Sequence, residues 1–184
     1  MFILYALPLG IVAGFLTGGR LAGLGEIRLR WAPLALLGLL VQVVLFLGPV
    51  AEGVGWLGMP IYIGSTLLVL IVVVRNVALP GLAVVALGAG SNLLAILANG
   101  GYMPASPAAM AFLGRTVNAG YSNSAVMPEP VLWPLTDIFA LPAGVPFANV
   151  FSVGDLLIGL GVAWALAAAM HRRSTAQSLV ARQG

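Results

Sequence analysis

The chain has 184 residues, of which 61% are hydrophobic and only 7% are charged, and its mean hydropathy is +1.09. Soluble globular domains carry about 25% charged residues, so this composition excludes an ordinary water-soluble enzyme and a disordered segment. The formal net charge is only +3 and every basic residue is arginine, so the high pI does not indicate a nucleic-acid partner. The composition indicates a membrane protein, and we expect the lipid bilayer to be one of its partners.

Five apolar segments are long enough to cross the hydrocarbon core, which takes about 20 residues of helix. They cover residues 1–18, 31–51, 54–74, 78–98 and 150–170. The sequence therefore predicts an all-α fold with five transmembrane helices. We expect one membrane domain over residues 1–173, followed by a tail over residues 174–184.

The first segment carries three glycines spaced four residues apart, Gly10, Gly14 and Gly18. Small residues at this spacing allow another helix to approach closely. Packing against a helix of the same chain is the simpler interpretation. The alternative is a homo-oligomer or a membrane partner that docks on this ridge.

The arginines predict the orientation of the bundle. Seven of the eight follow the first, third and fifth apolar segments, at Arg20, Arg28, Arg30, Arg75, Arg172, Arg173 and Arg182. Positive residues are enriched in cytoplasmic loops. The pattern predicts a multi-pass protein of the bacterial plasma membrane with its N-terminus outside and its C-terminus in the cytoplasm.

The connection between the fourth and fifth segments, residues 99–149, is much longer than the others and holds seven of the twelve prolines. Its aromatic residues argue against a solvated linker. We expect an ordered cap over the outer end of the bundle, with short interfacial or re-entrant pieces at Pro107–Gly114 and Val131–Leu141. Long ordered loops are usually functional, so we expect the functional site at this end of the bundle.

Polar residues near this end form the candidate site. Asn92 and Asp155 are predicted at similar depth, where their side chains can meet. A carboxylate below the headgroups is costly and suggests a functional role. The stretch from Ser152 to Asp155 is also a capping-box pattern, so helix capping and ligand binding both remain open. The predicted ligand-binding residues are Asn92, Asn99, Arg115, Asp137, Asn149, Ser152 and Asp155.

Three stretches resemble a family of small bacterial multi-pass membrane proteins known only as a domain of unknown function. They are Asn-Gly-Gly-Tyr-Met-Pro at 99–104, Leu-Thr-Asp-Ile at 135–138 and Asn-Val-Phe-Ser-Val-Gly-Asp at 149–155. The resemblance covers about residues 1–173 and implies a bacterial membrane protein, but it implies no activity or ligand. Family members often have glycine where this chain has Thr136.

No catalytic or metal-binding motif is present, and the chain has no cysteine and a single histidine, His171. We therefore expect no metal, no cofactor and no catalysis. The leading hypothesis is a protein that binds a small or amphiphilic ligand, such as a lipid, or a partner, at its extracytoplasmic end. The alternatives are an accessory subunit of a membrane complex and, less favoured, a small transporter.

Overall fold

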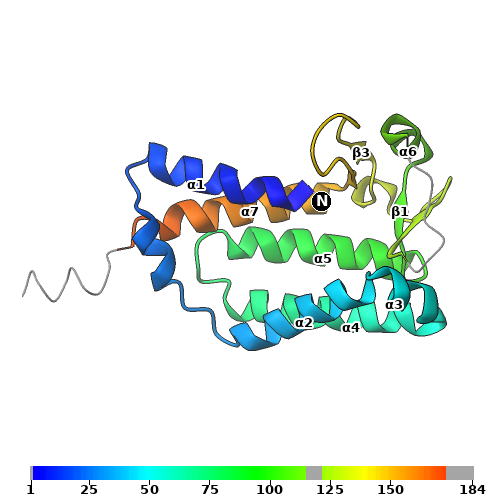
Figure 1. Cartoon of the computed structure of the whole chain (residues 1–184), viewed down its shortest axis with the longest axis horizontal. Helices are drawn as coiled ribbons and strands as arrows, with labels where there is room; N and C mark the ends of the chain where they lie inside the picture. The colour runs from blue at the N-terminus through cyan, green and yellow to red at the C-terminus, as the bar shows by residue number, and fades with distance from the viewer. Residues whose placement is uncertain (1, 115–121, 173–184) are drawn as a thin grey trace, which may run out of the picture.

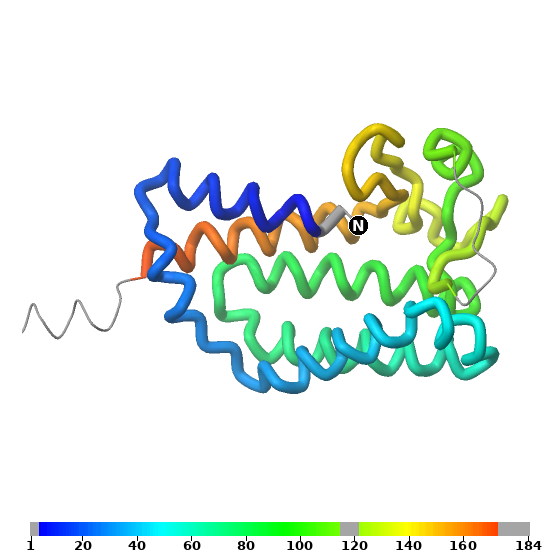
Figure 2. Tube along the Cα trace, viewed as in Figure 1, coloured from blue at the N-terminus to red at the C-terminus, as the bar shows by residue number. Residues whose placement is uncertain are grey.

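The computed structural model describes residues 2–114 and 122–172, and they form a mostly helical protein with two very short sheets (Figure 1). The helices α1, α7, α5 and α4 lie in one row in this order, and α2 packs against α4 (Figure 2). Their bounds are Ala6–Leu16 for α1, Ala32–Leu45 for α2, Gly58–Arg75 for α4, Leu82–Ala98 for α5 and Val153–Ala169 for α7. The short helices are α3 at Gly48–Gly53 and α6 at Pro107–Leu113. Short 3-10 helices lie at Phe2–Tyr5, Leu21–Glu26, Gly55–Leu57 and Trp133–Leu135.

Helices α2, α5 and α7 are shorter than the apolar segments predict, and prolines and a helix cap explain the difference. The expected helix over residues 31–51 is split into α2 and α3 near Pro49, which lies in the first turn of α3 and lacks an N–H group. The segment 78–98 becomes helical only at Leu82, after Pro80 and after Gly81 with a φ of +82°. The segment 150–170 begins as a strand, and its helix starts after Ser152.

Glycines set the spacing within the row of helices. A Cβ at Gly10 would lie 2.8 Å from the Ala163 backbone, and a Cβ at Gly14 would overlap Met170, so α1 packs tightly on α7 through these two glycines. This is the intrachain packing expected of the ridge for Gly10 and Gly14. Gly18 has no neighbour at its Cβ position among the described residues. Association of this ridge with another chain stays a prediction.

One helical segment, Gly55–Arg75, is long and apolar enough to cross a membrane, with a mean hydropathy of 2.3. The other main helices, α1, α2, α5 and α7, are apolar but have 10–17 residues each.

The arginine-bearing turns gather at one end of the row, where Arg20 N–H donates to Met170 and Arg172 donates to Glu26 (Figure 1). Arg75 lies over the Trp31 ring at the same end, 5.8 Å from its centroid. We call this the arginine end.

The segment between α5 and α7 forms an ordered cap at the opposite end (Figure 1). Strand β1, Met103–Ala105, pairs in parallel with β2, Ser124–Val126. Strand β3, Phe139–Ala140, pairs antiparallel with β4, Val150–Phe151. The expected piece at Pro107–Gly114 is α6, whereas the piece expected at Val131–Leu141 is a 3-10 turn followed by β3. The strands are a small addition to the predicted all-α fold, and they hold the cap above the ends of α5 and α7.

Candidate functional site

Three side chains close a ring where α5 meets the start of α7. Asn92 Nδ2 donates to Asp155 Oδ1 at 2.8 Å, and Ser152 Oγ donates to Asn92 Oδ1 at 2.8 Å. The Asp155 N–H donates to Ser152 Oγ at 3.0 Å, while the Ser152 N–H donates to Asp155 Oδ2 at 3.2 Å. The prediction that Asn92 and Asp155 meet is confirmed.

The ring also confirms the capping box at the start of α7. Both carboxylate oxygens of Asp155 accept a hydrogen bond, and the carboxylate lies in the first helical turn, where the helix dipole favours a negative charge. Asp155 is therefore a structurally compensated acid. Its role in capping does not remove it from the pocket described below, because the same side chain lines that pocket.

Asp137 is held in a different way, through its backbone. Its N–H donates to Pro104 O at 2.9 Å, and its carbonyl accepts from Ser106 N–H at 3.0 Å, which forms a bridge to β1 at Ala105. Just before it, Thr136 is only 1% exposed and donates to Trp133 O at 2.7 Å. These contacts fix the main chain at Asp137.

The carboxyl group of Asp137 is largely buried, and one of its two oxygens lacks a hydrogen bond among the described residues. Its residue is 8% exposed, and Oδ1 has no hydrogen-bond partner in the part of the chain that the structure describes. Burial, and secondly the negative charge of Asp155, raise the pKa of Asp137 to about 7. An acid of this kind changes its charge near neutral pH.

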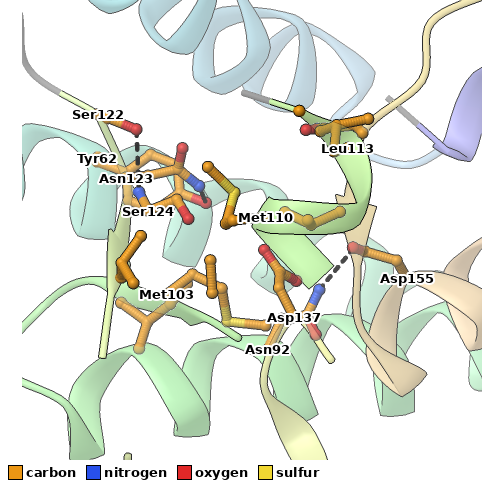
Figure 3. A pocket seen from close by; sticks show the side chains of 16 residues that line it. Tyr62, Asn92, Met103, Met110, Leu113, Ser122, Asn123, Ser124, Asp137 and Asp155 are labelled. Carbon is orange, nitrogen blue, oxygen red and sulfur yellow. Dashed lines mark hydrogen bonds between the residues drawn. The ribbon is translucent and has the colours of Figure 1, made fainter. Parts of the chain in front are cut away.

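The two acids border a pocket of about 630 Å³ between α4, α5, the start of α7 and the cap (Figure 3). We call it the cap pocket. Figure 3 shows the Asp137 side chain near Asn92 and the Asn92–Asp155 hydrogen bond at one side, with Tyr62 and Asn123 at the other. The described lining residues are Tyr62, Asn92, Ile96, Met103, Ala105, Met110, Leu113, Gly114, Ser122, Asn123, Ser124, Val126, Asp137, Asn149, Val150 and Asp155.

The walls of the cap pocket combine two chemistries. Amide, hydroxyl and carboxyl groups stand on several elements, and Asn123 donates to the Tyr62 hydroxyl at 3.1 Å. Ile96, Met103, Met110 and Leu113 supply apolar surface. None of the described lining residues is basic. The polar groups provide most of the accessible wall, and the apolar side chains provide a smaller part of it.

The structure brings together four of the seven predicted site residues, since Asn92, Asp137, Asn149 and Asp155 all line the cap pocket. Ser152 is fully buried behind Asn92 and is not part of the lining. Asn99 lies at the end of α5, where its side chain accepts from the Val131 N–H and donates to the Val131 carbonyl, both at 2.8 Å. It fastens the cap and does not line the pocket. Arg115 lies outside the described residues.

Residues 26–167 match the model of a family described as a family of unknown function (DUF5317). The chain belongs to the DUF5317 family. Every described residue that lines the cap pocket falls within the matched segment, whereas α1 precedes it. The pocket is therefore built from the part of the chain that corresponds to DUF5317. No curated protein and no solved structure gives a significant match.

Several lining residues of this DUF5317 chain were not predicted from the sequence. Tyr62 lies within an apolar helix, and Asn123 and Ser124 lie in a loop with no local motif. Met103 is part of the Asn-Gly-Gly-Tyr-Met-Pro stretch that carried the resemblance, which was the one available signal. The polar residues Gln42 and Thr66 join α2 to α4 by a 3.1 Å hydrogen bond and lie away from the pocket lining.

Proposed function

We propose that this protein is a multi-pass protein of the plasma membrane, with the arginine end in the cytoplasm and the cap outside. Large apolar side chains project outward along the helices: Leu16 is 82% exposed, Leu87 67% and Leu160 65%. Helices α5 and α7 have 17 residues each, which is the lower limit for crossing the hydrocarbon core at about 1.5 Å per residue. The clustered arginines favour the cytoplasmic placement of their end.

Within that membrane protein, the proposed activity is binding of a small or amphiphilic ligand in the cap pocket. The observation that carries this proposal is the buried Asp137 carboxyl group, which belongs to the pocket lining and whose Oδ1 has no hydrogen-bond partner among the described residues. Burying a polar group without a hydrogen bond costs about 1–3 kcal/mol, so such a group in a native fold calls for an explanation. A ligand that donates a hydrogen bond to Oδ1 removes this cost.

The arrangement favours binding over transport. Between the Asn92 ring and the arginine end, α5 and α7 are in close contact through Gly81, Gly88, Gly154 and Gly161, where a Cβ would collide with the opposite helix. Backbone atoms and small side chains fill this contact, whereas a transporter needs a polar path. The accessory-subunit alternative predicts an empty cap pocket and a tightly bound second protein.

Native mass spectrometry of the gently purified full chain tests the proposal. We expect a bound small molecule in the wild type and its loss in Met110→Trp, because the larger side chain fills the pocket. Phe112→Trp is the matched control, since Phe112 is on the same helix but is 62% exposed and not part of the lining. Equal occupancy in both variants, or a bound protein in place of a small molecule, would count against ligand binding.

A further inference from the structure

Among the residues that the structure describes, the charges around the cap pocket are unbalanced. Two carboxyl groups line it, and no basic side chain does so among the described residues. The two acids differ in how they are stabilised. Both oxygens of Asp155 accept hydrogen bonds and its charge lies at a helix N-terminus, whereas Asp137 Oδ1 has no such partner. Asp137 is therefore the acid in the pocket whose negative charge lacks a compensating contact.

We propose that the cap pocket selects an organic cation, an amphiphile with a protonated amine, whose N–H groups bind Asp137 and whose apolar part lies against Ile96, Met103 and Met110. This inference rests on the proposed ligand-binding function and specifies the charge class of the ligand. A neutral hydroxyl donor satisfies Oδ1 but leaves two like charges in one cavity. An ammonium group satisfies Oδ1 and also offsets the repulsion between Asp137 and Asp155.

The pocket fits an organic cation better than a metal ion. A divalent ion requires several converging oxygen ligands, usually with more than one free carboxylate. Among the described residues there is no group of three His, Cys, Asp or Glu side chains that could hold a metal. Asp155 already uses both oxygens within the protein. The volume of about 630 Å³ and the methionine side chains provide room and apolar contact for a hydrocarbon portion.

Three probes of equal chain length test the charge preference: hexylammonium, hexanol and hexanoate. They are added to the purified full chain in a neutral detergent at about pH 8, where the Asp137 carboxyl is mostly ionised. Binding is followed by calorimetry and by the rise in the unfolding midpoint. We expect hexylammonium to bind at least about tenfold more tightly than hexanol, and hexanoate to bind least.

Two variants assign the preference to the pocket. Asp137→Asn keeps the shape of the side chain and removes its charge, so the preference for hexylammonium over hexanol should disappear. Glu129→Gln removes the same charge from an exposed position of the cap that does not line the pocket, and the preference should remain. The unfolding midpoint without probe shows whether each variant is folded.

Equal binding of hexylammonium and hexanol to the wild type, with both blocked by Met110→Trp, would overturn the cation preference and leave the ligand-binding function intact. A preference that survives Asp137→Asn would also overturn the inference. So would stabilisation by Mg²⁺ or Ca²⁺ that requires Asp137 in the absence of hexylammonium binding, because it would assign a metal site. If no probe binds and the purified protein carries no small molecule, both proposals fail.

Discussion

Gly154 lies against Asn92 so closely that a side chain at position 154 would overlap the Asn92 amide oxygen. The same amide oxygen accepts the hydrogen bond from Ser152, and the amide nitrogen donates to Asp155. The absence of a Cβ at Gly154 thus allows α5 to approach the first turn of α7 and allows the ring to close. The contact between these two residues fixes one wall of the cap pocket.

Gly154→Ala should therefore destabilise the protein by about 2 kcal/mol or more, because neither the α5 backbone nor the amide of Asn92 can move without breaking contacts. Gly90→Ala is the matched control. Gly90 is also in a helix, its Cβ position has no neighbour, and alanine there should stabilise by about 0.5–1 kcal/mol. Unfolding midpoints in detergent measure both effects. A neutral Gly154→Ala would mean that the α5–α7 contact is looser than described.

Asn92→Ala should cost about 2 kcal/mol, since it leaves Ser152 Oγ and Asp155 Oδ1 without their partner in a partly buried place. Ser91→Ala serves as the control on the adjacent residue. Ser91 Oγ is buried and has no hydrogen-bond partner among the described residues, so its removal should be neutral or stabilising. Thermal unfolding midpoints of the two variants test this prediction. Equal losses of stability in both would contradict a stabilising role for the hydrogen bonds of Asn92.

The sequence alone predicted the parts of this site that depend on local pattern and helical geometry. The capping box was predicted from Ser152 and Asp155, and the contact of Asp155 with Asn92 was predicted from their similar depth in two helices. Likewise, Gly10 and Gly14 indicated a close helix contact. These features need only a spacing rule and the length of a helix.

The features that the sequence did not predict depend on long-range pairing in the cap. Tyr62 joins the pocket because Asn123, 61 residues later, donates to its hydroxyl. Asn99 was predicted to bind the ligand, but α5 ends at Ala98 and the Asn99 amide pairs with Val131. No local pattern indicates that β1 pairs with β2, or that Asp137 forms a bridge with Ala105. Helix ends were predicted too long because hydropathy does not register Pro49, Pro80 or the Ser152 cap.

Asp137 should make the protein less stable as the pH rises. Its pKa is 3.8 as a free side chain and about 7 in the fold, so between these values the folded state holds a proton that the unfolded state has lost. The contribution of Asp137 to the free energy of unfolding is therefore largest below about pH 4. It falls by about 4 kcal/mol as the pH rises towards 7. The titratable groups that line the same pocket are Asp155 from α7, whose negative charge raises the pKa of Asp137, and Tyr62 from α4.

Asp137→Asn should remove this fall and should raise the stability above that of the wild type at about pH 8. Glu129→Gln, an exposed acid of the cap outside the pocket lining, should leave the fall unchanged. Unfolding midpoints of the three proteins between about pH 5 and pH 8 provide the measurement. A wild type whose stability rises over this range would show that the Asp137 carboxylate is compensated by a partner within the protein.

The sidedness of the two ends is open to direct labelling because the chain has no cysteine of its own. Gly144 in the cap and Gly25 at the arginine end are both exposed, with open space at their Cβ positions. In intact cells, a membrane-impermeant maleimide should label Gly144→Cys and should label Gly25→Cys only after permeabilisation, because arginine-rich ends remain in the cytoplasm. Labelling of both positions from outside would contradict a bundle that spans the membrane between them. Labelling of Gly25→Cys alone would reverse the orientation and place the cap pocket in the cytoplasm.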